Sequence, residues 1–312
     1  MTTAVILGDL IEYSWKNDVF RAAEILGWDV VTFDPTKPVT TDTIFNTCWM
    51  HLADLFIWPR WGQSVEGDVE VLYHNLNQIG TKSVAIHQDL YWDRPERAEF
   101  WKDDWFKADY VFTADGDPSR AWFAVDVNHY WMPPAIPDRF VGRGELKKEY
   151  DCDVVFVGSV QKVHGQWRKD LISFAQKRYG KRFEFYGLST AGAVWGDELK
   201  NVYASAKVVL GDSVDVPWTW SDRIPNTLGR GGCLVHPDTL GLSETFGRGI
   251  SYYERGNLGD VAFHIDRLLD DPASRAEQSD IGFFEVYRKH TWSARLDEIA
   301  RTVLGETYDA KG

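Results

Sequence analysis

Two segments in the second half of the chain place cationic and polar side chains directly after short apolar runs. In the first segment, an apolar run ends at Gly158 and Ser159. Arg168 then falls in the first turn of the helix expected next. A glycine lets the backbone approach an anion, and a helix N-terminus with an arginine beside it offers positive charge. The segment therefore predicts a site for a small anion such as a diphosphate. A tight turn beside a solvent-exposed arginine is the alternative.

The second segment consists of Gly211, Asp212 and Ser213 and then of residues 218–237, which read WTWSDRIPNTLGRGGCLVHP. Ser221 or Asp222 is suited to cap a short helix, because both side chains accept hydrogen bonds from free amides of a first helical turn. Arg223 would then point out of that turn, and Asn226 would lie on the same helix face. A cation for phosphate and an amide for ribose hydroxyls suit a nucleotide sugar. An ordinary corner with a surface pair between Arg223 and Asp222 is the alternative.

The elements that position these segments follow from an alternation of short apolar runs with amphipathic stretches, which is typical of βαβ units and mostly parallel sheets. The pattern predicts strands at residues 3–8, 28–33, 54–58, 82–87, 110–114, 153–158, 182–186, 207–210, 233–236 and 250–253. Helices are expected at 16–26, 166–179, 196–204, 222–230, 257–269, 272–288 and 293–304.

A Pro-rich and charged stretch at residues 133–150 separates the two series of strands. Prolines fix the backbone and remove amide donors, so this stretch reads as a linker. We expect an α/β protein with two Rossmann-like domains, residues 1–140 and 141–312, whose parallel sheets face a central cleft. The last helix is a candidate for packing back on the N-terminal domain.

Composition excludes several classes of protein. The chain has 312 residues, 44% of them hydrophobic and 14% aromatic, which excludes general disorder. Apolar runs stay well below the roughly 18–20 residues that cross a bilayer. The N-terminal residues lack the basic region of a signal peptide, and three cysteines cannot build a disulfide framework. We therefore expect a cytoplasmic protein with no membrane segment.

The net charge of −13 is unevenly distributed. Residues 1–140 contain 11 Lys and Arg against 22 Asp and Glu, whereas residues 141–312 contain 23 against 25. An acidic first half is a poor surface for a nucleic acid, because contacts from Lys and Arg to phosphates supply most of the nonspecific affinity. The nearly neutral second half is better suited to a small anionic ligand.

The order of motifs in the second half resembles a known family. The matching segments are 203–210, 221–223, 231–237, 246–249, 268–272 and 288–292. Together they resemble the C-terminal half of GT-B glycosyltransferases, specifically the CgeB-like group with its glycosyl transferases group 1 C-terminal domain. The resemblance covers about half of the chain. The first half is similar only in its Rossmann-like style and in residues 108–116.

The resemblance implies a nucleotide-sugar donor site in the second domain, with a UDP-, GDP- or dTDP-sugar as the donor and a hexosyl or related group transferred. Gly158 and Ser159 would lie by the diphosphate, Arg168 or Arg223 would offset its charge, and the segment after Tyr186 and Gly187 would lie near the base. Ser221, Asp222, Asn226 and Gly231 belong to the same expected site. Many relatives carry Glu-x(7)-Glu here, where this chain has Trp218 and Asn226. Asn226 still binds hydroxyls, but this departure leaves the sugar contact open.

Transfer also needs an acceptor hydroxyl that is oriented or deprotonated, and candidates for this task follow strands of the first half. Asp89 is the preferred base and His87 the second, because both directly follow an apolar run. A buried structural histidine and a helix-capping aspartate are the alternatives, and a retaining enzyme needs no base. Acceptor-binding candidates are Gly8, Glu12, Trp58, Trp61 and Asp115. Histidine and carboxylate spacing shows no metal motif, so we expect metal-independent chemistry without a cofactor.

Three functions remain open at this point. The first is transfer of a sugar to a glycan or a small molecule. The second is transfer to a hydroxymethylated DNA base, as in phage enzymes, where stacking aromatic side chains could hold a flipped base. The third is a nucleotide-sugar-binding protein without turnover. The sequence does not indicate an oligomeric state.

Overall fold

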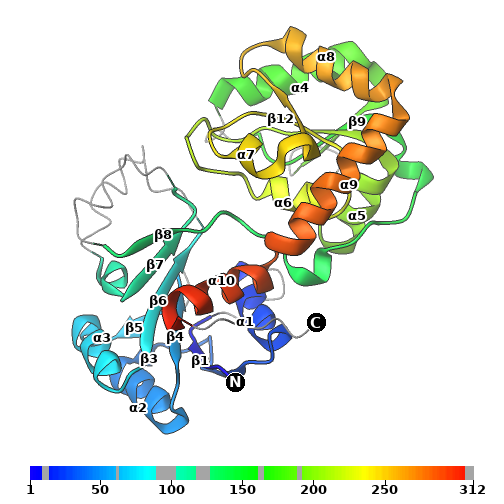
Figure 1. The fold of residues 1–312 in the computed structure, drawn as a ribbon. Helices are drawn as coiled ribbons and strands as arrows, with labels where there is room; N and C mark the ends of the chain where they lie inside the picture. The colour runs from blue at the N-terminus through cyan, green and yellow to red at the C-terminus, as the bar shows by residue number, and fades with distance from the viewer. Residues whose placement is uncertain are drawn as a thin grey trace. The chain divides into compact units, whose positions relative to one another are not determined.

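The computed structural model describes residues 1–8, 14–60, 63–88, 103–116, 127–160, 165–187 and 192–305. The chain divides into two compact units, Met1–Pro133 with Trp292–Gly312 and Pro134–Thr291 (Figure 1). The boundary expected after residue 140 differs from this division. The difference arises because the segment after Pro133 is tied to the second unit, where the Ile136 amide donates to the His290 carbonyl at 3.0 Å.

The first unit contains a six-stranded parallel sheet with the order β2-β1-β4-β6-β7-β8. Its strands are β1 (Thr3–Ile6), β2 (Asp29–Thr32), β4 (Leu55–Pro59), β6 (Lys82–His87), β7 (Tyr110–Thr113) and β8 (His129–Trp131). Two short strands, β3 (Val39–Thr40) and β5 (Val65–Glu66), pair separately. The central strands are apolar throughout, as expected for a sheet covered on both faces.

In the described part of this unit, the sheet is accompanied by the α-helices α1 (Trp15–Ile25), α2 (Thr41–His51), α3 (Val69–Gln78) and α10 (Trp292–Leu304). The α2 and α3 helices contribute Ile44, Leu72 and Leu76 to the core of the unit. Helix α10 lies beside α1, where the rings of Trp15 and Trp292 stack with centroids 5.7 Å apart (Figure 1). The last helix is therefore part of the first unit's packing.

The second unit is built on a five-stranded parallel sheet with the order β10-β9-β11-β12-β13. The strands are β9 (Cys152–Val157), β10 (Phe183–Tyr186), β11 (Ala206–Leu210), β12 (Leu234–Pro237) and β13 (Ile250–Tyr253). The helices are α4 (Gly165–Tyr179), α5 (Gly196–Ser205), α6 (Arg223–Leu228), α7 (Leu242–Phe246), α8 (Leu258–Asp270) and α9 (Pro272–Lys289). Helices α4 and α8 pack on one face, through Leu171, Ile265 and Leu268.

The elements expected from the sequence agree with the structure to within two residues at each end. The pattern gave no ranges for α2 and α3, and it did not predict β8, which has only three residues, nor the short β3, β5 and α7. Helix α6 is shorter than the expected 222–230, since Gly229 and Gly231 follow it and the Gly231 backbone has a φ of +76°. Because the strands are parallel, their carboxyl ends form one edge of the sheet, and side chains after β9, β10, β11 and β13 share that edge.

Candidate functional site

Gly158 follows β9 and Gly187 follows β10. Because neither has a side chain, the two strand ends can lie directly against each other. The Gly158 amide donates to the Tyr186 carbonyl at 2.9 Å, and Gly158 has a φ of +145°. A Cβ on Gly158 would collide with the guanidinium of Arg223, and one on Gly187 would lie 2.5 Å from the Gly158 oxygen. Side chains at either position would push the strand ends apart or displace Arg223.

Arg223 is buried at the start of α6, with 9% of its surface exposed. Its Nε donates to the Val157 carbonyl at 3.1 Å and its Nη1 to the Asp212 carbonyl. The guanidinium lies 4.6 Å from the ring centroid of Phe156. The structure therefore brings Arg223 to the end of β9 rather than to a surface pair with Asp222, which is exposed.

Arg168 is even more deeply buried, at 3% exposure, so the alternative of a solvent-exposed side chain is wrong. Its Nε forms an ion pair with Asp212 Oδ2 at 3.0 Å, and its Nη1 donates to the Ser159 carbonyl at 3.0 Å. Burial lowers the pKa of Arg168, and repulsion from Arg223 lowers it further. Two of the expected donor-site cations thus lie close together, at a cost in electrostatic repulsion.

Two charged residues that were given no role from the sequence complete this group. Asp212 follows β11 and is 1% exposed. Arg255 follows β13, and its Nη1 lies 3.0 Å from Asp212 Oδ1. We call Arg168, Arg223, Arg255 and Asp212 the arginine cluster. The signal for Asp212 was present in the sequence, because an acidic residue directly after an apolar strand was the criterion that selected Asp89.

The other donor-site candidates lie at different distances from the arginine cluster. Ser221 Oγ accepts from the Arg223 amide at 3.3 Å, so Ser221 rather than Asp222 holds the start of α6. Asn226 was expected to face hydroxyls, but its Nδ2 donates to the Asp222 carbonyl at 2.8 Å. Its Oδ1 accepts from Arg230 at 2.6 Å. Burial raises the pKa of Tyr186 to about 12, so its phenol stays neutral.

Gly231 is not brought together with the other donor-site candidates. It precedes β12, so it lies toward the amino end of that strand, whereas Gly158 and Arg223 lie at carboxyl ends. A Cβ on Gly231 would lie 2.7 Å from Arg143 Cγ. Its left-handed φ lets the chain turn after α6, and this turn is the role that the structure gives it.

Trp218 is the residue expected at the position where many relatives carry the first glutamate. Its backbone has a φ of 54°, an unusual value for a residue with a bulky side chain. Its ring lies against Gly241, where a Cβ would collide with it, and its amide donates to the Leu240 carbonyl at 3.1 Å. Backbone strain of this kind often occurs at functional sites.

The acceptor-side candidates of the first unit are mostly buried where the structure describes them. His87 ends β6 at 1% exposure, with its ring edge-on to Trp105. Asp115 is also buried, and Trp58 packs against the core of the unit. Gly8 is half-buried just after β1. Asp89, Glu12 and Trp61 lie outside the described residues.

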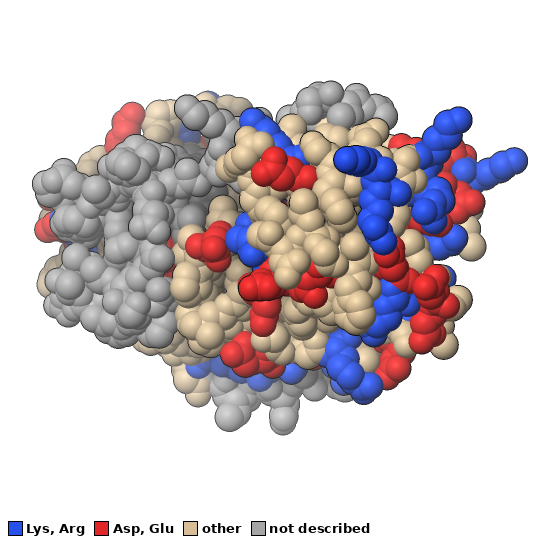
Figure 2. All heavy atoms as spheres, turned by 90° about the horizontal axis from the view of Figure 1, so that it is seen from above, with Lys and Arg blue, Asp and Glu red and all other residues tan. Residues whose placement is uncertain are grey.

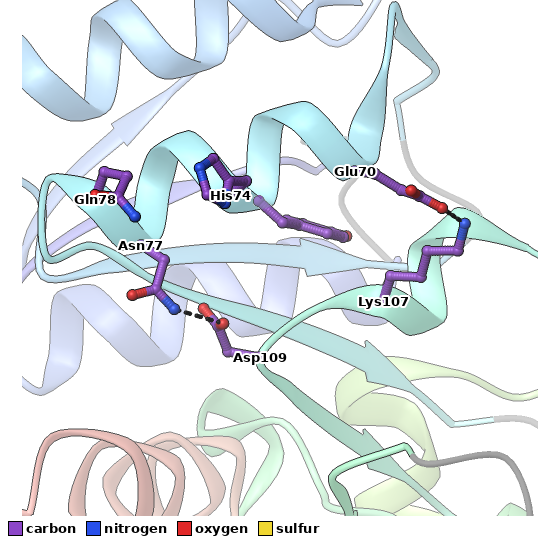
Figure 3. A pocket seen from close by; sticks show the side chains of 7 residues that line it. Glu70, His74, Asn77, Gln78, Lys107 and Asp109 are labelled. Atoms are coloured by element: carbon purple, nitrogen blue, oxygen red, sulfur yellow. Dashed lines mark hydrogen bonds and ion pairs between the residues drawn. The ribbon is translucent and has the colours of Figure 1, made fainter.

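A pocket of about 550 Å³ lies on α3 and the segment before β7, lined by Glu70, Tyr73, His74, Asn77, Gln78, Lys107 and Asp109 (Figure 3). Lys107 forms an ion pair with Glu70, and Asn77 donates to Asp109 at 3.2 Å. Asp109 precedes β7, so the pocket lies toward the amino end of that strand. It contains none of the candidate residues.

Comparison with known proteins decides the family. Residues 144–301 match the family described as glycosyl transferase-like. The chain belongs to this glycosyltransferase family. Curated protein sequences gave no match.

Solved structures of glycosyltransferases share the fold of this glycosyltransferase. A glycosyltransferase from Rickettsia africae has a TM-score of 0.62 and 11% identity, covering 98% of this chain and 99% of the other. Anabaena HepE in complex with UDP-glucose has a TM-score of 0.61 and 12% identity, covering 98% and 100%. An α-glucosyltransferase in complex with UDP and a 13-mer DNA containing an HMU base has 0.63 and 9%, covering 98% and 99%. The architecture is GT-B, with two Rossmann-like units.

Two further properties bear on the glycosyltransferase. Of the described helices, none is long and apolar enough to span a membrane. Within the same described part of the chain, His, Cys, Asp and Glu side chains do not gather in threes as metal ligands do.

Proposed function

We propose that this glycosyltransferase moves a hexosyl or related group from a nucleotide diphosphate sugar to an acceptor hydroxyl. The observation that carries the proposal is the arginine cluster at the carboxyl edge of the second unit's sheet. There Arg168 and Arg255 pair with the buried carboxylate of Asp212, and Arg223 donates to its main-chain carbonyl. Positive charge in excess of its partner, held away from water, favours binding of an anion.

Transfer breaks the bond between the anomeric carbon and a diphosphate oxygen while the acceptor oxygen bonds to that carbon. Negative charge grows on the leaving diphosphate, and donors already oriented toward it stabilise the transition state. Arg168 and Arg223 are oriented in this way by backbone carbonyls at the ends of β9 and β11. The chain's own cations supply charge for this step, and we therefore propose that it needs no metal ion.

The remaining donor-site roles are proposals by position. Gly158 and Ser159 would lie by the diphosphate, and the segment after Tyr186 and Gly187 by the base. HepE and the α-glucosyltransferase were each solved with a uridine nucleotide, which supports a UDP-sugar. On the acceptor side, Asp89 or His87 would take the proton, and Glu12, Trp58, Trp61 and Asp115 would contact the acceptor.

Transfer to a modified DNA base is the second candidate, and the DNA complex of the α-glucosyltransferase favours it. The excess of 22 acidic over 11 basic residues in residues 1–140 disfavours it. On the face drawn in Figure 2, acidic and basic side chains of the described residues lie next to one another. We therefore place a glycan or small-molecule hydroxyl first.

To test the proposed transfer, the protein is incubated with UDP-, GDP- and dTDP-sugars. The released nucleoside diphosphate is then measured with and without acceptors. One acceptor is an oligonucleotide with hydroxymethylated bases, tested at low and high salt. We expect release with at least one donor and faster release with a sugar or small-molecule acceptor. Donor-induced thermal stabilisation without release would show a binding protein and contradict the proposal. Transfer to the oligonucleotide alone would select the DNA function.

A further inference from the structure

The arginine cluster is organised around one residue, Asp212. The backbone just before it is fixed by β12 and β13. The Gly211 amide donates to the Val235 carbonyl at 2.8 Å, and the Tyr253 hydroxyl donates to the Gly211 carbonyl at 2.9 Å. Asp212 is therefore a rigid point at the carboxyl edge of the sheet.

Each oxygen of Asp212 contacts an arginine. Oδ2 lies 3.0 Å from Arg168 Nε, and Oδ1 lies 3.0 Å from Arg255 Nη1. The main-chain oxygen accepts from Arg168 Nη2 at 3.2 Å and from Arg223 Nη1. The three arginines belong to different elements, α4, α6 and the segment after β13, so only this residue is shared by all three.

The three cations repel one another. The guanidinium groups of Arg168 and Arg223 lie 5.9 and 4.6 Å from the centroid of the same ring, Phe156, and share the Asp212 carbonyl. Asp215, which is 78% exposed, lies 3.9 Å from Arg255 Nε, so the three guanidinium groups face two carboxylates. The buried carboxylate of Asp212 cannot neutralise them alone. It can hold two of them in place, and the positive charge that it leaves uncompensated is available to an anion.

Ser213, the next residue, provides a second indication of a ligand. Its side chain is 3% exposed, and its Oγ has no hydrogen-bond partner among the described residues. A buried hydroxyl without a partner is costly, and a bound anion would satisfy it. Its carbonyl already accepts from Arg255 Nη2 at 2.5 Å, so the hydroxyl lies in the residue that adjoins both Asp212 and Arg255.

We infer that Asp212 is the positioning residue of the donor site and that Arg255 is its third cation. This inference rests on the proposed function. Asp212 fixes the guanidinium groups where the leaving diphosphate develops charge, and it limits how tightly the released nucleoside diphosphate is held. Losing its carboxylate would leave more positive charge but less order, so binding and turnover should change in opposite directions.

The test compares Asp212→Asn with Asp153→Asn in the full chain. Asp153 also bridges two cations, Arg182 at 2.6 Å and Lys207 at 2.7 Å, but at the start of β9. For Asp212→Asn we expect kcat to fall about 10- to 100-fold, while the Kd for UDP stays the same or tightens. For Asp153→Asn we expect kcat and the Kd for UDP to stay within about twofold of the wild-type values.

Three results would overturn the inference. One is Asp212→Asn with wild-type kcat. Another is a parallel loss of kcat and UDP binding that follows the folded fraction, which indicates a purely structural role. If Asp212→Asn does not fold, Arg255→Gln decides, because loss of the third cation should weaken UDP binding about tenfold and unchanged binding contradicts its role. A wild-type protein that turns over no donor would refute the proposed function instead.

Discussion

Each edge of the second unit's sheet has an aspartate that pairs with two cations. The cations are more exposed to solvent at the amino edge than at the carboxyl edge. At the carboxyl edge, Asp212 binds Arg168 and Arg255 and is 1% exposed. At the amino edge, Asp153 binds Arg182 and Lys207, whose side chains are 60% and 47% exposed. Burial alone would raise the pKa of Asp153, but hydrogen bonds from Lys207 and Arg182 outweigh it and lower that pKa.

The difference between the edges lies in solvent and in the balance of charge. Exposed ion pairs are screened by water and contribute little, whereas buried cations keep their field. Of the two edges, the carboxyl edge adds a third arginine, Arg223. The second acid there, Asp215, is 78% exposed and lies 3.9 Å from Arg255 Nε. An aspartate with two cations is therefore a surface feature at one edge and part of a proposed binding site at the other.

Among substitutions that compare the two edges, loss of Arg223 should have the largest effect. We expect Arg223→Ala to lower kcat/KM about 100- to 1,000-fold, because it removes a fixed donor to the leaving group. It should also abolish stabilisation of the fold by UDP. Donor turnover and melting with and without UDP measure both. Arg182→Ala is the matched control at the amino edge, and equal losses in the two variants would contradict the distinction.

Stability should show the same contrast. Arg168→Met leaves the buried Asp212 carboxylate with one ion-pair partner fewer, so we expect the free energy of unfolding to fall by about 3 kcal/mol. Lys207→Met removes a half-exposed partner of Asp153 and should cost less than about 1 kcal/mol. Urea denaturation measures the two values. A cost at Lys207 as large as that at Arg168 would mean that burial does not distinguish the edges.

Local patterns in the sequence were sufficient for most strands and helices of both units, since each is an apolar or amphipathic run, but not for the short β3, β5, β8 and α7. They could not show which strand ends are neighbours. Strand β9 lies between β10 and β11 in the sheet although β10 and β11 follow it in the chain. Arg168 lies on α4, which follows β9, and Asp212 follows β11, so this order brings the two side chains together.

Other differences between the expected and the observed site could have been recognised in the sequence. Arg230 lies four residues after Asn226, a spacing that brings two side chains together on a helix, and the two are hydrogen-bonded. Gly231 precedes a strand, so its place away from the carboxyl edge followed from chain direction alone.

We expect low pH to lower the free energy of unfolding through His236, which lies in β12. Burial lowers the pKa of His236 from 6.5 to about 3. Between these values the unfolded chain binds a proton that the folded chain does not, so the free energy of unfolding falls as pH falls. One such group contributes at most about 1.4 kcal/mol per pH unit. Urea denaturation at several pH values should show a shallower slope for His236→Gln. An identical slope would show that His236 titrates normally in the folded protein.

The smallest expected effect comes from comparing alanine substitutions at two glycines. Both glycines have backbone conformations that disfavour a side chain, but only one of the two adjoins the arginine cluster. Gly158 has a φ of +145° and Gly142 a φ of +131°. An added Cβ would collide with Arg223 at Gly158, and it would meet nothing within 4 Å at Gly142. Alanine should cost about 1–2 kcal/mol of stability at either position through backbone strain.

Activity should distinguish the two glycine variants. We expect Gly158→Ala to lower kcat/KM about tenfold, because Arg223 must move away from the end of β9. Gly142→Ala should keep kcat/KM within about twofold of the wild type. Donor turnover at matched folded fraction measures the difference. If both variants lose activity in proportion to stability, strain alone accounts for the glycines and the approach of Arg223 to the backbone of Gly158 has no part in transfer.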